Sequence, residues 1–361
     1  MDRRSRHRDD DPAAALERGS RAARAQLSRG RILQPQAKRA LTWALAVLAV
    51  LGAAAGVWWY VGGRDDGSVS LATAPKNTEP QVTFAGVFPP LSDPALKNPL
   101  GIAVIGDRVF VSESDAGVIR EFAADGGRRG SIALPRAPGA AAVYPADLAA
   151  VDADTLAVID TASSRVLLVS TTSGAAPLVL GATDAKTAPG QPTAVARLAD
   201  GIAVADGRDH LVKVYDAEGR FLRKLDSSRG PRLGFVGGMA LAGGRLQIAD
   251  SSAGRVVSVD LSSGAQSGTF ADRIQLARGV ASAGESSVLV VSTFGRSLSL
   301  YDGSDGRRLA ILGEDTTGLP DGARLVLPKG VAWMAATSRA YVADAGDGRI
   351  RVFNVITGAG K

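Results

Sequence analysis

The sequence contains no cysteine, which excludes disulfide bonds and thiolate metal sites. Histidine is almost as scarce, because only His7, in a basic N-terminal segment, and His210 occur. A lone imidazole in a chain without a G-x-S-x-G motif lacks the partners of nucleophilic catalysis. We therefore expect His210 to be an ordinary exposed turn residue.

Aromatic residues are also few, at 5%, whereas glycine is abundant at 43 residues, a composition that favours many turns and small-residue packing. Most of the chain also lacks an excess of charge. Residues 1–39 hold eleven Arg and Lys against five Asp and Glu, which accounts for the whole formal charge of +6. Because residues 40–361 are balanced, a basic nucleic-acid surface is not expected.

No charged residue occurs from Ala40 to Gly63, a stretch of 24 residues. About 20 apolar residues suffice to cross the hydrocarbon core of a bilayer, so this segment predicts one transmembrane α-helix. Trp58, Trp59 and Tyr60 occupy the place of an interfacial aromatic belt, and the arginine excess before the span predicts a cytoplasmic N-terminus. The alternative is a cleavable signal peptide, whose basic and apolar parts are normally much shorter.

We therefore expect a single-pass protein of the bacterial plasma membrane, the bacterial assignment being based on the bias towards Arg and Ala. Residues 1–39 form a disordered cytoplasmic tail, 40–63 the span in the lipid bilayer, 64–80 a polar linker and 81–361 an extracytoplasmic domain. Gly52 and Gly56 have the G-x-x-x-G spacing that lets two helices approach closely. In an Ala- and Gly-rich span this spacing also arises by chance, so weak helix dimerisation stays an open alternative.

A repeat of about 46 residues occupies the domain. Each unit has an apolar strand that ends at a shared, mostly acidic position, and an apolar or aromatic residue follows nine residues later. The shared position holds Glu113, Asp160, Asp206, Asp250, Ser292 and Asp344. A second shared position upstream is always alanine, at Ala103, Ala149, Ala196, Ala240, Ala281 and Ala332. A small residue there suggests a crowded strand where the units converge.

Each unit predicts four short strands joined by Gly, Ser and Asp turns, which is the pattern of a propeller blade. The sequence thus predicts an all-β, six-bladed β-propeller with four-stranded antiparallel blades. The sixth unit lacks its fourth strand, because the chain stops at Lys361. An unassigned apolar run, residues 81–88, precedes the first unit. We expect it to pair with the last blade, which would close the ring and remove a free edge.

The pattern P-x-G-[IV]-A, followed by a strand that ends in Asp and then by an Arg, closely resembles NHL repeats. "PKGVAWMAATSRAYVADAGDGRIRVF" is the best copy, and the resemblance covers nearly all of residues 81–361. It implies the propeller fold and says little about function. The Arg five residues after the acid is kept at Arg165, Arg255 and Arg349 but is replaced by Val118, Leu211 and Ser297. Pairing of that Arg with the acid therefore cannot be needed by every blade.

The repeat indicates a structural role for Glu113, Asp160, Asp206, Asp250 and Asp344. A carboxylate at a strand end can accept hydrogen bonds from the N–H groups of the turn that follows. A cation loop is the alternative for such Asp-Gly turns. Related propeller enzymes hold zinc with several histidines or calcium with a Glu/Asn/Asp set, and the domain has one histidine and only Asn98 and Asn354 as asparagines. We expect no catalytic residue, cofactor or metal.

The long, Pro-rich connections before each inner strand are candidates for recognition, because variable loops on a rigid scaffold commonly bind ligands. They should share one face of the ring with the acid-ended turns. The expected binding face comprises Arg136, Arg229, Arg232, Glu314, Asp315, Asp321 and Arg324, with Trp333 either lining the channel mouth or packing between blades.

Two function classes fit the sequence. The first, which we favour, is a membrane-anchored, non-catalytic binding or scaffold module whose partner is an extracytoplasmic protein, peptide or glycan. The second is a propeller-type hydrolase or lyase that uses carboxylates at the channel mouth. The sequence does not identify the ligand.

Overall fold

The computed structural model describes residues 79–182, 184–225, 233–270, 273–313 and 316–358. The expected tail, the expected span 40–63 with Gly52 and Gly56, and most of the linker lie outside the described residues. Among the residues that are described, no helix is long and apolar enough to cross a membrane.

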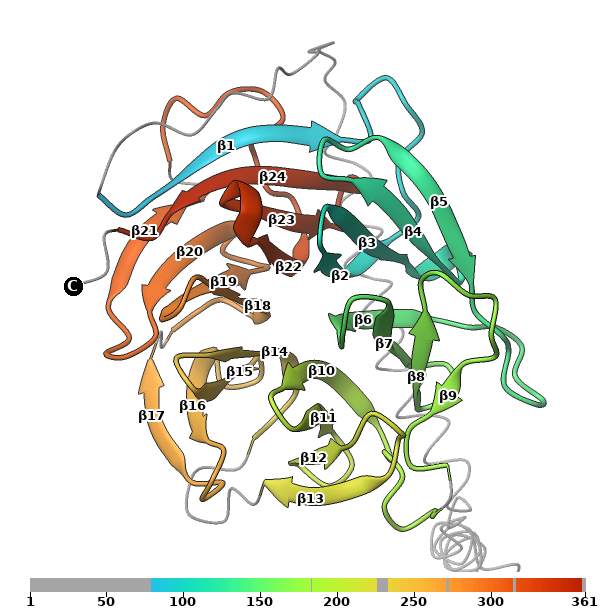
Figure 1. Ribbon diagram of the computed structural model, residues 1–361. Helices are drawn as coiled ribbons and strands as arrows, with labels where there is room; N and C mark the ends of the chain where they lie inside the picture. Colours follow the sequence, from blue (N-terminus) through green and yellow to red (C-terminus); the bar gives the residue numbers. More distant parts are fainter. Residues whose placement is uncertain (1–78, 183, 226–232, 271–272, 314–315, 359–361) are drawn as a thin grey trace, which may run out of the picture. The chain divides into compact units, whose positions relative to one another are not determined.

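The described chain folds into six four-stranded antiparallel sheets arranged as blades around a central axis (Figure 1). This confirms the predicted all-β, six-bladed propeller. In each of the first five blades the strands follow the chain from the axis outwards. These blades are β2 (Pro99–Ile105), β3 (Arg108–Glu113), β4 (Val118–Ala123) and β5 (Arg128–Ala133); β6 (Pro145–Ala150), β7 (Thr155–Asp160), β8 (Arg165–Ser170) and β9 (Leu178–Val179); β10 (Pro192–Leu198), β11 (Gly201–Asp206), β12 (Leu211–Tyr215) and β13 (Phe221–Leu225); β14 (Val236–Ala242), β15 (Arg245–Asp250), β16 (Arg255–Asp260) and β17 (Gln266–Phe270); and β18 (Ala277–Ala283), β19 (Ser287–Ser292), β20 (Ser297–Asp302) and β21 (Arg308–Leu312).

The sixth blade combines both ends of the domain. It contains β22 (Pro328–Met334), β23 (Arg339–Asp344) and β24 (Arg349–Ile356), and its outer strand is β1 (Gln81–Phe88). β1 runs antiparallel to β24 and lies along the outer edge of the ring (Figure 1). The pairing is the one expected from the position of this run before the first repeat, and it covers the edge that β24 would otherwise expose.

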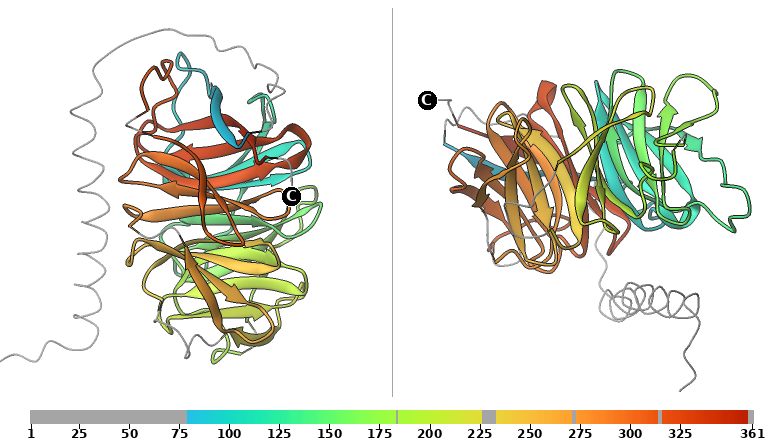
Figure 2. Two further views of the ribbon diagram at one scale, coloured as in Figure 1. Left: turned by 90° about the vertical axis from the view of Figure 1, so that its left-hand side faces the viewer. Right: turned by 90° about the horizontal axis from the view of Figure 1, so that it is seen from below.

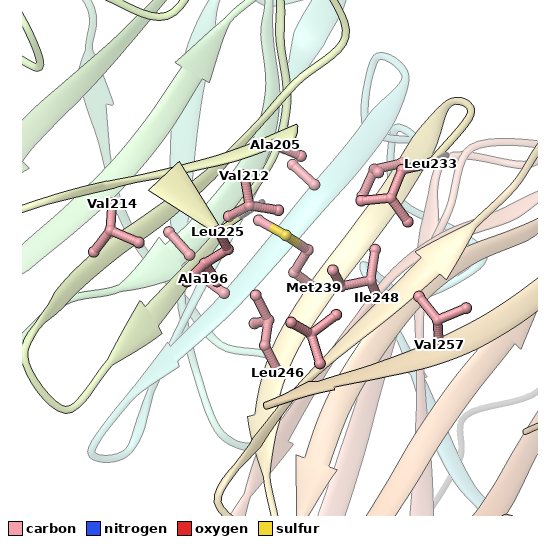
Figure 3. Packing of buried hydrophobic residues seen from close by; sticks show 14 of the residues in the cluster. Ala196, Ala205, Val212, Val214, Leu225, Leu233, Met239, Leu246, Ile248 and Val257 are labelled. Carbon is pink, nitrogen blue, oxygen red and sulfur yellow. The ribbon is translucent and has the colours of Figure 1, made fainter. Parts of the chain in front are cut away.

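Hydrophobic cores fill the spaces between adjacent blades. One core joins Val212 and Val214 of β12 to Met239 of β14 and Ile248 of β15 (Figure 3). The second strand of each blade is buried on both sides, which explains its nearly unbroken apolar sequence. The side views of Figure 2 show the strands of each blade running between two opposite faces of the ring.

The fourth strand of blade 2 is shorter than expected, because β9 comprises only Leu178–Val179. Pro177 precedes it directly and has no N–H to donate to a ladder. Helical structure in the described residues is limited to two single 3₁₀ turns, Ser114–Ala116 and Ala335–Thr337.

Candidate functional site: the loop face and the central channel

Two sets of connections meet on one face of the ring, which we call the loop face. It consists of the turns after the shared acidic position (114–117, 161–164, 207–210, 251–254, 293–296 and 345–348) and the described parts of the connections between blades (89–98, 134–144, 180–191, 233–235, 273–276 and 316–327). Hydrogen bonds link the two sets, as when the N–H of Gly207 donates to the carbonyl of Gln191 at 2.8 Å. The sequence-based expectation that they share a face is therefore confirmed. The other face, with the turns between first and second and between third and fourth strands, is called the hairpin face.

The repeat acids hold the connections to the blades. Each accepts a hydrogen bond from an N–H that precedes it by 16 to 18 residues: Lys97 to Glu113, Tyr144 to Asp160, Gly190 to Asp206, Gly234 to Asp250 and Val326 to Asp344. The expected bonds from the following turn occur at Asp206, Asp250 and Asp344. The bonds to the connection were missed, because sequence spacing alone did not show that the connection returns to this strand end.

Every repeat acid also pairs with a cation on the third strand of its own blade. Arg165 and Arg255 follow their acids by five residues and pair with Asp160 and Asp250. In the other acidic blades the cation follows by seven residues, in the pairs Glu113 with Arg120, Asp206 with Lys213 and Asp344 with Arg351. Positions five and seven lie on the same side of a strand, so either can reach the acid. Arg349 faces Asp344 across the ladder but donates to the carbonyls of Leu91 and Asp93 instead.

These contacts act differently on the pKa of Asp344 and of Asp206: at Asp344 burial outweighs the Arg351 guanidinium and the N–H donors, and the pKa is raised. Burial acts to raise the pKa of Asp206, but the N–H of Gly190 and the ammonium of Lys213 outweigh it, and the pKa is lowered. In blade 5 Ser292 replaces the acid and donates to the carbonyl of Gln275 at 2.9 Å, and Ser297 and Ser299 replace the cations. Blade 5 thus has neutral residues both where the other blades have the acid and where they have its cation.

The central channel has two sections. A narrow cavity of about 40 Å³ lies where the inner strands begin, at the loop face. A wider one of about 500 Å³ lies further along the same strands and is lined by all six shared alanines. Ile102, Leu148, Val195, Met239 and Val280 line both sections, so these apolar side chains mark the division between them.

Three charged side chains line the narrow section: Asp147 of β6, Arg278 of β18 and Lys329 of β22. All three are half-buried. Burial raises the pKa of Asp147 to about 7, although the N–H of Val195 donates to its Oδ2 at 2.9 Å. Burial and the nearby guanidinium of Arg278 lower the pKa of Lys329 to about 8. The sequence-based prediction missed this cluster, since each residue belongs to a different repeat.

The predicted binding-face residues are only partly covered by the structure. Arg136, Asp321 and Arg324 are exposed and lie in loop-face connections. Arg229, Arg232, Glu314 and Asp315 lie outside the described residues. The structure adds two aromatic side chains to this face, Phe235 and Phe294, with exposed fractions of 42% and 58%. The guanidinium carbon of Arg278 lies 4.9 Å from the ring centroid of Phe235.

The expectation that Trp333 contributes to the loop-face mouth needs correction. β22 begins at the loop face with Pro328, which is opposite Asp344, and Trp333 comes five residues later. A strand advances by about 3.3 Å per residue, so Trp333 lies towards the hairpin face. There it is half-buried, lines the wide section and packs against a core between blades 5 and 6. Packing between blades therefore applies, and Trp333 also lines the channel, in the wide section and not at the loop-face mouth.

His210 is exposed, as expected, and occupies the left-handed position of the blade 3 turn with φ of 57°. Gly117, Gly254 and Gly348 occupy the same position in other blades, which shows that the turn imposes this conformation. Among the described residues no group of three or more His, Cys, Asp or Glu side chains lies close enough together to hold a metal ion.

Comparison with known proteins supports the fold. No family model matches the chain, and no curated protein matches it. A streptogramin B lyase structure covers 73% of this chain and 95% of its own, at 13% identity with a TM-score of 0.52. Virginiamycin B lyase from Staphylococcus aureus covers 72% and 95%, at 14% identity and 0.50. A protein of unknown function from Bacteroides thetaiotaomicron covers 73% and 71%, at 18% identity and 0.55. These similarities show a shared propeller fold, and the resemblance to NHL repeats remains a resemblance.

Proposed function

We propose that the protein is a non-catalytic binding or scaffold module, anchored in the bacterial plasma membrane by residues 40–63, whose loop face captures an extracytoplasmic protein, peptide or glycan. The observation that carries the proposal is the composition of the loop face. Phe235 and Phe294 are exposed there, and the exposed charges of Arg136, Asp321 and Arg324 share that face. Aromatic side chains that become buried when a partner binds, surrounded by polar residues, are typical of binding hot spots.

The backbone of the aromatic pair is held in place. The N–H of Phe294 donates to the carbonyl of Gln275 at 3.0 Å, and that of Phe235 donates to Oγ of Ser252 at 2.8 Å. The repeat acids are engaged by cations of their own blades and by N–H groups of the connections, which leaves the side chains of the connections to present the variable chemistry. A rigid platform with exposed aromatic groups limits the entropy lost on binding.

The membrane anchor is tested by topology. Protease added to intact spheroplasts should degrade the propeller, while the full-length protein stays with the membrane fraction before treatment. The reason is the uncharged stretch of 24 residues with more basic residues before it. A mature protein that begins near residue 60 or later would show that the segment is a cleaved signal instead.

Binding by the loop face is tested by charge reversal. The full chain, purified in mild detergent, is used to capture ligands from cell-envelope extracts, which mass spectrometry then identifies. Arg136→Glu with Arg324→Glu should reduce capture at least several-fold without lowering the melting temperature, because rim charges mainly tune encounter and specificity.

The matched control reverses two exposed arginines on the hairpin face, Arg220→Glu with Arg307→Glu, whose side chains are 70% and 67% exposed. This control should capture as much ligand as the wild type. Equal capture by all three proteins would place the binding site away from the loop face.

A hydrolase or lyase acting at the channel mouth is the second candidate. Asp147 favours it, because a carboxyl group with a pKa of about 7 is suited to general acid–base catalysis. The two fold neighbours named as lyases are too distant in sequence, at 13% and 14% identity, to transfer their activity. If the wild type returned the captured ligand in chemically altered form and the Asp147→Asn variant returned it intact, the result would favour an enzyme.

A further inference from the structure

Two cations at the loop-face end of the channel stand at the same position of the repeat. Arg278 and Lys329 each lie three residues before the shared alanine, where the other blades carry Leu100, Ala146, Thr193 and Gly237. In blade 2 a carboxylate, Asp147, comes one residue later than that position. The three side chains approach one another because the inner strands converge on the axis, and they line the same narrow cavity.

Neither cation is used by the fold in the way that the third-strand cations are. Lys213 and Arg351 each form two ion pairs within their own blades. Among the described residues, by contrast, no hydrogen bond or ion pair involves the side-chain nitrogens of Arg278 or Lys329. Arg278 stacks on Phe235, and stacking leaves its N–H groups free to donate in the plane of the guanidinium.

We propose that Arg278 and Lys329 form a binding site for one oxyanion group, a carboxylate or a phosphate-type group, at the loop-face end of the channel. A cavity of about 40 Å³ admits a single such group and not a whole ligand. The planar guanidinium matches the oxygen pair of an oxyanion, and the ammonium adds a second charge-assisted donor. The proposal does not depend on the proposed function, although an acidic group of a loop-face ligand would fit the same site.

Glycine residues let the inner strands that carry the cations pack closely against their neighbours. A Cβ on Gly238 would lie 2.5 Å from the carbonyl oxygen of Arg278, and one on Gly279 would lie 2.6 Å from that of Lys329. A larger side chain at either position is therefore excluded by neighbouring backbone. The inner strands approach closely enough for side chains from blades 5 and 6 to share one ligand.

Asp147 sets the charge of the site. The groups that face it are the guanidinium of Arg278 from β18, the N–H of Val195 from β10 and the N–H of Leu148 from its own strand, while β2 contributes only the uncharged Leu100 and Gly101. Lys329 is influenced by Arg278 and, more weakly, by Asp344. As the pH rises from 6 to 9, Asp147 gains a negative charge and Lys329 loses its positive charge, so affinity for an anion falls.

The test uses sulfate and acetate as probes, because both keep their charge throughout this pH range. Isothermal titration of the full chain in mild detergent, at constant ionic strength set with chloride, should give saturable binding at pH 6 in the millimolar range. Arg278→Gln and Lys329→Gln should each weaken binding roughly tenfold, as expected for loss of a charge-assisted hydrogen bond. Stronger binding of sulfate would indicate a phosphate-type ligand, and stronger binding of acetate a carboxylate.

Two matched controls remove the same charges elsewhere. Arg307→Gln on the hairpin face and Lys224→Gln on the outer strand β13 should bind both probes like the wild type. Asp147→Asn should bind more tightly than the wild type at pH 8 and should depend less on pH. Absence of saturable binding, or equal losses in the control variants, would overturn the proposal. Because no partner is involved, this result is independent of whether the loop face captures a ligand.

Discussion

At the scale of single residues, each acidic blade pairs its buried repeat acid with a cation at one of two positions on the third strand. The cation stands directly opposite the acid in the ladder, as in Asp160 with Arg165, or two residues further along the strand, as in Asp206 with Lys213. Both positions project to the same side, so the fold requires a cation near the acid rather than at one fixed place. This explains why the arginine five residues after the acid is absent from some repeats.

Moving the cation in blade 3 tests this equivalence. Lys213→Leu should lower the free energy of unfolding by about 3 kcal/mol, because it leaves the buried carboxylate of Asp206 without its charged partner. The N–H groups of Gly190 and Gln191 still donate to that carboxylate, which keeps the loss at the lower end of the usual range. Adding Leu211→Arg, which stands opposite Asp206, should restore at least half of the loss.

Urea unfolding of the single and double variants measures both effects. Leu211→Arg alone serves as the control, because it adds a cation without removing one. If the double variant were no more stable than Lys213→Leu alone, the two positions would not be equivalent and the geometry of each blade would fix its own partner.

The repeat made the acids recognisable in the sequence, but the cations that pair with some of them and the charged cluster in the channel could not be recognised in the same way. The cations of blades 1, 3 and 6, Arg120, Lys213 and Arg351, resemble ordinary strand residues because nothing local ties them to an acid seven positions earlier. The channel cluster was missed for a different reason. Comparing the blades at the third position before the shared alanine would have revealed Arg278 and Lys329, but only convergence of the strands in space brings them together.

At the scale of elements, β1 joins the first and last blades. Phe88, at its end, is only 3% exposed and packs against Phe122 of blade 1 and Tyr341 of blade 6, with ring centroids 5.0 and 6.2 Å away. A single side chain therefore contacts both blades at the closure of the ring. The strand was predictable because an apolar run had no other place in the repeat.

Phe88→Ala should lower the free energy of unfolding by about 3 to 5 kcal/mol, the usual loss when a buried phenylalanine is truncated. Phe294→Ala removes an equal number of atoms from a side chain that is 58% exposed and should change stability by no more than about 0.5 kcal/mol. Chemical denaturation of the two variants provides the comparison. Similar stabilities would mean that closure by β1 contributes little to the ring.

At the scale of the whole molecule, the two ends of the channel differ in chemistry. The loop-face end is narrow and lined by three charged residues, Asp147, Arg278 and Lys329, whereas the wide section beyond it is lined mainly by alanines and larger apolar residues, with Trp333 and one charged residue, Arg197. The fold could be predicted because it repeats six times. The chemistry of the channel could not, because it depends on residues in which the repeats differ.

The central claim is that a partner contacts the loop face, and photocrosslinking tests it most directly. Benzoylphenylalanine is introduced in place of Phe294 on the loop face or, as the control, in place of Asp305 on the hairpin face, where the side chain is 57% exposed. After irradiation of living cells of the native host, the full chain should form a discrete adduct from position 294 and none from position 305. An adduct from position 305 with none from position 294 would contradict the account.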